Sequence, residues 1–239
     1  MAVMPSTATT ARAPLTGISS MATRQLLAEL TAAHAERTGQ VVTIASVGGV
    51  DAARRVQTGE AFDVVVLASD AIDKLVASGH LRGGSKVDLV HSGVAVTVRS
   101  GRPQPDIASE DAVRQAVLAA KSLSYSTGPS GVALAKLFER WGIADQIKDR
   151  ILTPPPGVPV GSLVAKGAVE LGFQQLSELI HVEGITIVGP LPPAIQITTT
   201  FSAAITTTST RAPDVQTLLD FMASNDAAAA KIRQGMEPA

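Results

Sequence analysis

The chain has 239 residues, of which 45% are hydrophobic, and a formal net charge of −1. This size is sufficient to bury a core in one large domain or in two smaller lobes. The nearly neutral charge gives no field that would attract nucleic acid or an anionic membrane, and an aromatic content of 3% argues against a base-stacking surface. Cysteine is absent, which excludes disulfides and thiolate metal sites.

The first 13 residues are small and polar, and we predict that they are disordered. They lack the continuous apolar stretch of a secretory signal, and no run of the sequence reaches the roughly 20 apolar residues that span a bilayer. We therefore expect a cytoplasmic protein without membrane insertion. The alternative is a periplasmic protein from which a signal peptide has been removed.

Apolar runs rich in β-branched residues alternate with helical patterns along the rest of the chain. After a short lead-in to Gly17–Ser20, strands are predicted at 41–46, 63–69, 92–100, 122–127, 184–189 and 195–208. Helices are predicted at 21–37, 69–78, 110–120, 131–141, 162–169 and 214–222. The runs at 41–46 and 63–69 have the composition of strands that are covered on both faces. This alternation predicts an α/β fold with mainly parallel sheets.

The chain is expected to cross between two lobes twice. We expect it to pass into the second lobe near residue 92, within 88–98, and to return near residue 192, within the proline-rich stretch from Gly189 to Ile197. We predict that residues 14–92 and 193–239 form lobe 1 and that residues 93–192 form lobe 2.

Four predicted strand ends carry small polar residues directly before a helix, at 17–20, 46–49, 68–70 and 126–131. Ligands of open α/β sheets bind outside such strand ends, where helix N-termini present free N–H groups to anions. Each turn also has a purely structural explanation. Ser20 and Asp70 are suited to cap helices, and Gly48 with Gly49 is suited to a tight turn. Together the four turns favour a shared anion-binding cleft.

No pattern in the sequence indicates a metal or cofactor site. The four histidines are scattered without ligand spacing, and His34 is expected on the solvated side of its helix. No nucleophile elbow or phosphate loop occurs. Arg54 follows Gly49 by one to two helical turns and could hold a carboxylate through two hydrogen bonds, although such an arginine is usually just solvated.

The chain resembles the type II periplasmic-binding-protein fold, and within it the molybdate-binding proteins of ABC transporters. The resemblance runs from Leu15 to Pro238 and is carried by GISSMATRQLLAELTAAHAERTG, ARRVQTGEAFDVVVLASDAIDKLVASG, PSGVALAKLFERWGI, LGFQQLSEL and LDFMASNDAAAAKIRQGMEP. It implies two lobes in a clamshell, a hinge of two crossing strands, and an anion held in the cleft by neutral donors.

The resemblance also suggests ligand-binding positions. Ser20 matches the first anion-binding serine of these proteins, Gly48 and Gly49 stand where the second serine is, and Ala68 and Val160 match backbone donors. Ser130 replaces a small apolar residue, and Gln175 replaces a tyrosine that orders the site. The lost serine and tyrosine favour a larger polar ligand than molybdate. The full predicted ligand-binding set is Ser19, Ser20, Gly48, Gly49, Ala68, Ser69, Ser130, Val160, Gln174, Gln175 and Arg54.

Some relatives of the molybdate-binding proteins resemble aconitate isomerase, which shifts a double bond in an unsaturated tricarboxylate. We therefore expect an isomerase of this type, acting on a small anion without a cofactor. Its reaction requires a group that takes an allylic proton, for which Glu178, Asp70 and Tyr125 are the candidates by position. The first alternative is the solute-binding component of an ABC transporter, whose partner would be the permease. A cytoplasmic ligand sensor is the second alternative.

Overall fold

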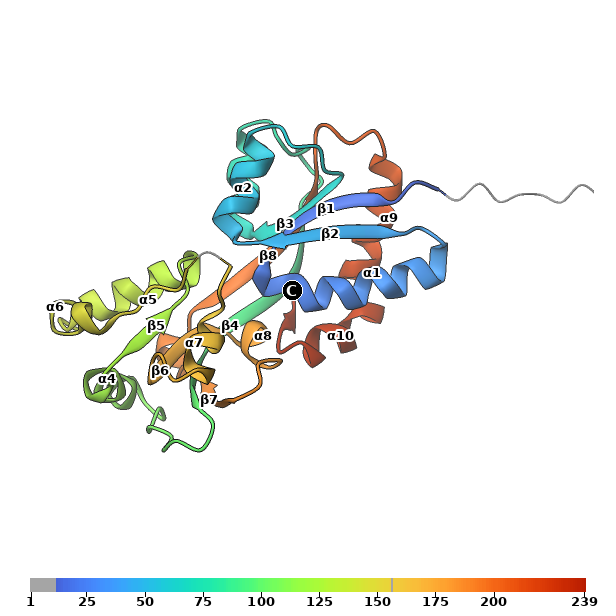
Figure 1. Cartoon of the computed structure of the whole chain (residues 1–239). Helices are drawn as coiled ribbons and strands as arrows, with labels where there is room; N and C mark the ends of the chain where they lie inside the picture. Colours follow the sequence, from blue (N-terminus) through green and yellow to red (C-terminus); the bar gives the residue numbers. More distant parts are fainter. Residues whose placement is uncertain (1–11, 156) are drawn as a thin grey trace, which may run out of the picture.

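The computed structural model describes residues 12–155 and 157–239, so most of the segment predicted to be disordered lies outside the described residues. The fold is mixed α/β, with one curled sheet whose strand order is β2-β1-β3-β8-β4-β6-β5, and with β7 and β9 paired to β4. Figure 1 shows helices packed around the two ends of this sheet, which we call the terminal half and the middle half. Among the described residues, no helix has the length and apolar character needed to cross a membrane.

The terminal half combines the beginning and the end of the chain. Its elements are β1 (Leu15–Ser20), the 3₁₀ turn η1 (Met21–Thr23), α1 (Arg24–Thr38), β2 (Val42–Val47), α2 (Gly49–Gln57), β3 (Val64–Ala68), α3 (Ser69–Ala77), α9 (Ala212–Ala223) and α10 (Ala228–Arg233). Every residue of β3 is buried, because helices cover both faces of this central strand. β2 was expected to be equally buried, but its residues are mostly half-exposed because it lies at the sheet edge.

The middle half is built from the central part of the sequence. Its elements are α4 (Glu110–Ala119), β5 (Leu123–Tyr125), α5 (Pro129–Arg140), α6 (Ala144–Ile147), α7 (Val160–Ala165), β6 (Leu171–Gln175), α8 (Leu176–Leu179) and β7 (Ile185–Pro190). Its core is separate from the cores of the terminal half, and Phe138 and Phe173 meet there edge to face, with ring centroids 6.2 Å apart. Such aromatic pairs bury large apolar areas and give the core a specific geometry.

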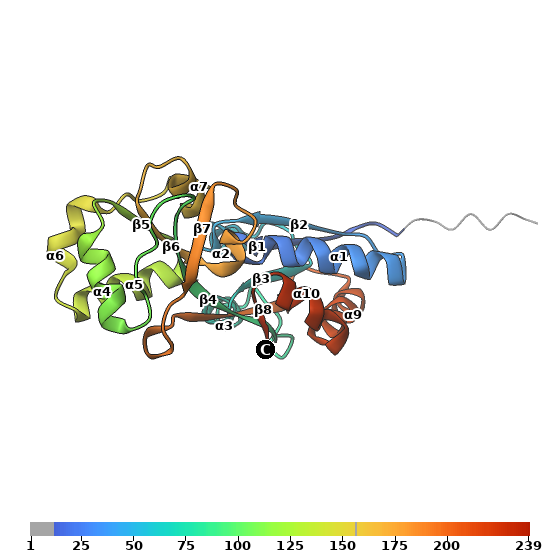
Figure 2. The same ribbon diagram turned by 90° about the horizontal axis from the view of Figure 1, so that it is seen from below.

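Two long strands connect the halves (Figure 2). The first part of β4 (Val87–Arg99) pairs with β8 (Thr198–Ile205) and with the short β9 (Glu237–Pro238), and its second part pairs with β6 and β7. All of these pairings and the β3–β8 pairing are antiparallel, whereas β1–β2, β1–β3 and β5–β6 are parallel. The expectation of mainly parallel sheets is therefore wrong: because the chain enters and leaves the middle half along neighbouring strands, these strands must run in opposite directions.

One helix position also differs from its expectation. His34 was expected on the solvated side of α1, but it is 2% exposed and its ring lies 5.8 Å from that of Phe221. The reason is that α9 packs on this side of α1. Burial lowers the pKa of His34, so the neutral imidazole behaves as part of the helix interface.

Candidate functional site

Three strand ends of the terminal half lie at the same level of the sheet. Ser20 pairs with Val47 of β2, and the β1–β3 register, in which Ser19 pairs with Val66, places Leu67 next to Ser20. The turns that follow β1, β2 and β3 therefore open at one edge. These turns carry six of the residues predicted to bind a ligand: Ser19, Ser20, Gly48, Gly49, Ala68 and Ser69.

Among the side chains that the structure describes at this edge, the Ser20 hydroxyl alone is buried without a hydrogen-bond partner. Its residue is 7% exposed, and its Oγ makes no hydrogen bond to the described residues. Ser20 occupies the N-cap position of η1, as the sequence predicts, but its side chain bonds no N–H group there. An unsatisfied buried hydroxyl costs about 1–3 kcal/mol, so such a group is expected where a ligand completes the site.

The neighbouring turns leave room around Ser20. The Ser19 hydroxyl is already bonded to that of Ser46, at 2.9 Å. By contrast, a Cβ atom at Gly48 would meet nothing within 4 Å, and one at Gly49 would come only into ordinary contact with the Ser20 Cβ, at 3.7 Å. α2 begins at Gly49, so its free N–H groups and positive dipole end lie beside Ser20.

The third turn also starts a helix at this edge. α3 begins at Ser69, with the buried Ala68 at the N-cap position. Asp70 does not cap a helix that begins at Ala71, as one interpretation had it; it lies in the first turn of α3, exposed and 3.7 Å from Lys74. This position agrees poorly with a role as a buried base.

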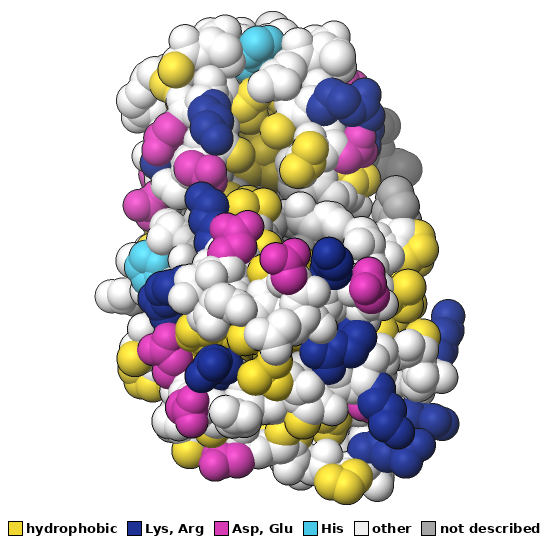
Figure 3. Space-filling model, turned by 90° about the vertical axis from the view of Figure 1, so that its left-hand side faces the viewer, with side chains coloured by type: hydrophobic (Ala, Val, Ile, Leu, Met, Phe, Trp, Pro, Cys, Tyr) yellow, Lys and Arg dark blue, Asp and Glu magenta, His cyan; other side chains and the backbone are white. Residues whose placement is uncertain are grey.

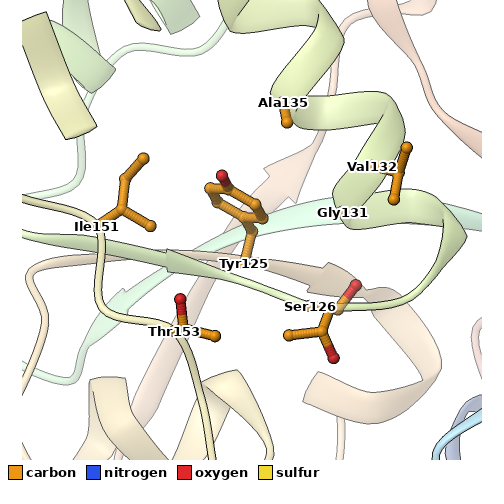
Figure 4. A pocket seen from close by; sticks show the side chains of 8 residues that line it. Tyr125, Ser126, Gly131, Val132, Ala135, Ile151 and Thr153 are labelled. Carbon is orange, nitrogen blue, oxygen red and sulfur yellow. The ribbon is translucent and has the colours of Figure 1, made fainter. Parts of the chain in front are cut away.

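In the middle half, Ser130 lies at the start of α5 and is 7% exposed. Its hydroxyl is bonded to that of Ser126, at 3.0 Å, across the turn that follows β5. A pocket of about 260 Å³ opens beside this turn, and Figure 4 shows the Tyr125 ring standing between Ile151 and α5. Burial raises the pKa of Tyr125, which keeps its phenol protonated and a hydrogen-bond donor.

Gln174 joins two other elements of the middle half. It is 4% exposed at the end of β6, and its Oε1 accepts a hydrogen bond from the backbone N–H of Gly161, at 3.2 Å. Its Nε2 donates to a carboxylate oxygen of Glu178, at 2.9 Å. Val160, the predicted backbone donor next to Gly161, is the first residue of α7 and is buried.

Glu178 lies on α8, where it is partly buried. Burial raises its pKa to about 7, and the hydrogen bond from Gln174 opposes this rise. Of the three residues proposed as proton acceptors, Glu178 alone combines an acidic side chain with loss of solvent.

Gln175 forms hydrogen bonds to the two connecting strands, β4 and β8. With its amide nitrogen directed at β4, it donates to the carbonyl oxygen of Ser92, at 3.0 Å, and its own oxygen accepts from the hydroxyl of Thr199 on β8, at 2.9 Å. Gln175 is 3% exposed. Both polar atoms of its side chain are thus hydrogen-bonded within the protein. Gln175 therefore has no free donor for the ligand contact that the sequence predicts.

A hydrogen bond joins the middle half to the terminal half close to this edge. The Ser177 hydroxyl on α8 donates to the carbonyl oxygen of Ala22 in η1, at 2.9 Å. Ala22 is two residues after Ser20, and Ser177 precedes Glu178. Figure 3 shows the surface hollowed between the levels of α2 and α5, with hydrophobic and uncharged side chains inside the hollow. Ser177 and Gly161 were not predicted from the sequence, because no local pattern distinguishes them from other small helix residues.

Arg54 does not join this group. Its side chain is 64% exposed on α2 and is paired with Asp51, one turn before it. The described part of the chain holds no cluster of three or more histidine or acidic residues that could bind a metal ion. This candidate site therefore offers the Ser20 hydroxyl and nearby backbone N–H groups, which suit an anion, and the partly buried carboxyl group of Glu178 near the contact between the halves.

Comparisons with known proteins place the chain in a family. The bacterial extracellular solute-binding protein family matches residues 15–237. An aconitate isomerase of Pseudomonas sp is 40% identical over 232 residues, which is 94% of this chain and 87% of the relative.

Solved structures show the same fold at low sequence identity. The periplasmic molybdate-binding protein of Azotobacter vinelandii has a TM-score of 0.78 and 20% identity, over 93% of this chain and 98% of the other. The sulfate-binding protein SubI of Mycobacterium tuberculosis H37Rv has a TM-score of 0.73 and 17% identity, over 95% and 87%. The chain thus belongs to the bacterial extracellular solute-binding protein family, and within it is a homologue of an aconitate isomerase.

Proposed function

We propose that this protein is an isomerase that moves the carbon–carbon double bond of a small unsaturated polycarboxylate, with aconitate as the substrate to test first. The observation that carries this proposal is the 40% identity to an aconitate isomerase over 94% of the chain. The charge of the site is consistent with this proposal. The neutral donors around Ser20 can bind carboxylates without adding a positive charge that would weaken a neighbouring base.

In this proposal the two halves close on the substrate as the lobes of a clamshell, with β4 and β8 as the hinge. The substrate carboxylates bind the Ser20 hydroxyl and the N–H groups at the start of α2. The reaction removes a proton from the methylene carbon, shifts the double bond, and places a proton on the former vinyl carbon. Atoms and charge balance without an oxidant, a reductant or a cofactor.

Proton NMR of purified protein with cis-aconitate tests this function. We expect trans-aconitate to accumulate until the same ratio is reached from either isomer. Absence of conversion above the protein-free rate, together with absence of binding by calorimetry, would exclude aconitate as the substrate.

The second candidate is an oxyanion-binding protein of a transport system. The structural neighbours that are named for molybdate and sulfate favour it. It predicts a rise in melting temperature with millimolar molybdate, tungstate or sulfate, since ligand at 100 times its Kd stabilises the folded state by about 2.7 kcal/mol. An unchanged melting curve with all three anions would exclude it. The cytoplasmic location stays a prediction under either function.

A further inference from the structure

The proposed reaction needs a proton carrier, and Glu178 has a distinctive position among the acidic residues. Most carboxylates of the described chain lie on exposed surfaces, and many of them pair with arginine or lysine there. Glu178 is partly buried and has no ion pair among the described residues; its one side-chain partner is the neutral amide of Gln174. A carboxylate without a cation keeps its basicity.

The surroundings of Glu178 also place it where the two halves touch. It follows Ser177, which bonds Ala22 of η1, and Ala22 lies two residues from Ser20. Because consecutive Cα atoms lie about 3.8 Å apart, this contact keeps the backbone of Glu178 close to the unpartnered Ser20 hydroxyl. A substrate of the size of a tricarboxylate that binds at Ser20 can therefore extend toward α8.

The amide of Gln174 fixes the orientation of the carboxylate. Because its oxygen already accepts from the Gly161 N–H, its nitrogen is the atom that faces Glu178. This arrangement determines which way the amide points without adding a charge. One carboxylate oxygen of Glu178 is held by this bond, and the carboxyl group keeps a second oxygen for proton transfer.

On the basis of the proposed function, we propose that Glu178 carries the proton in the isomerisation, and that Gln174 is the positioning residue that holds its carboxylate. The Glu178 carboxylate takes a proton from the substrate methylene carbon while the electron pair of that C–H bond forms the new double bond. The former double-bond electrons move toward the other end of the allylic system. The protonated Glu178 then gives its proton to the former vinyl carbon, which restores the carboxylate.

The acidity of Glu178 suits both steps. A group whose pKa is about 7 is substantially ionised at neutral pH, yet its acid form still donates readily. The other candidates fit less well. Asp70 is exposed beside Lys74, and the raised pKa of Tyr125 leaves its phenol protonated.

The decisive experiment compares wild-type protein with Glu178→Gln, with Glu183→Gln as the matched control. Glu183 is an exposed glutamate five residues further along the chain. Three quantities are measured: the rate of aconitate conversion by NMR, exchange of the substrate methylene protons in D₂O, and the Kd of cis-aconitate by calorimetry. We expect Glu178→Gln to lose at least about 100-fold in both conversion and exchange and to keep its Kd within about threefold. Glu183→Gln is expected to match wild type.

The outcomes separate this assignment from the proposed function. If wild type converts aconitate and Glu178→Gln does so within about threefold, the assignment is overturned and the function stands. A wild type that neither converts nor binds aconitate excludes aconitate as the substrate, and the assignment of Glu178 falls with it. Should Glu178→Gln melt well below wild type, Glu178→Asp replaces it, for which we expect slower exchange with unchanged binding.

Gln174→Met tests the positioning role through a pH profile. The amide hydrogen bond favours the ionised form of Glu178, so its removal is expected to shift the acid limb of kcat/KM to higher pH. A purely structural role would lower the rate equally at every pH, and this outcome would overturn the role of Gln174.

Discussion

The two halves of the molecule present different kinds of polar group at the place where they meet. In the terminal half, the Ser20 hydroxyl has no partner among the described residues, and the turn at Gly48 and Gly49 leaves space beside it. In the middle half, by contrast, the hydroxyls of Ser126 and Ser130 bond each other, and Gln174 is bonded at both ends of its amide.

This difference indicates that the two halves have different roles toward a ligand. A half with open donors gains hydrogen bonds when an anion arrives, whereas a half whose polar groups are already bonded keeps its geometry with or without the anion. We infer that the terminal half provides binding contacts and that the middle half provides fixed groups for chemistry.

The largest expected effect concerns the rigid turn of the middle half. A Cβ atom at Gly131 would lie 1.6 Å from the carbonyl oxygen of Ser126, so Gly131→Ala forces the turn after β5 to move. We expect the free energy of unfolding in urea to fall by about 3 kcal/mol or more. Gly48→Ala is the control in the terminal half, where the space is open, and should cost less than about 1 kcal/mol. Equal losses would contradict the contrast between a packed turn and an open one.

Ser20→Ala tests the open donor of the terminal half. The substitution breaks no hydrogen bond within the described protein and removes a buried hydroxyl that has no partner there, so the melting temperature without ligand should not fall. The Kd for the substrate should rise by about tenfold or more, because a hydrogen bond to a charged group contributes about 1.5–3 kcal/mol. Calorimetry and melting curves with and without cis-aconitate measure the two effects. Equal losses of melting temperature in both conditions would show that Ser20 is structural.

The pH dependence tests the fixed carboxyl group of the middle half. Because burial raises the pKa of Glu178 to about 7 and the proposed reaction begins with its ionised form, kcat/KM should fall as the pH drops below this value. The limiting slope is about tenfold per pH unit. Rates measured from pH 5 to pH 9 with both isomers give the profile. A rate that is independent of pH between 5 and 7 would argue against Glu178 as the group that starts the reaction.

The smallest effect is expected for Arg54→Ala. Because Arg54 is exposed and paired with Asp51, the substitution should change stability by less than about 0.5 kcal/mol and the Kd of the substrate by less than about twofold. A tenfold loss of affinity would show that Arg54 swings into the cleft, and would add a charged contact to a half that otherwise binds through neutral donors.

Local patterns predicted many of the elements but not all of their surroundings. The β-branched run at 63–69 gave a buried strand, and the 3.6-residue spacing of 21–37 gave η1 and α1. The similar run at 41–46 gave an edge strand, since strand order depends on pairing across the whole chain. The five-residue strand β6 was not among the predicted strands, because two glutamines end it and their burial depends on β4 and α7.

The sequence by itself determined the alternation of strands and helices, the neutral character of the turns and the candidacy of Ser20, because these follow from residue types within a few positions of one another. The tertiary structure alone decided that the Ser20 hydroxyl has no partner among the described residues, that Gln175 bonds the connecting strands and that Glu178 is partly buried. Burial and hydrogen bonding depend on groups brought together from distant parts of the chain, so no local pattern contains them.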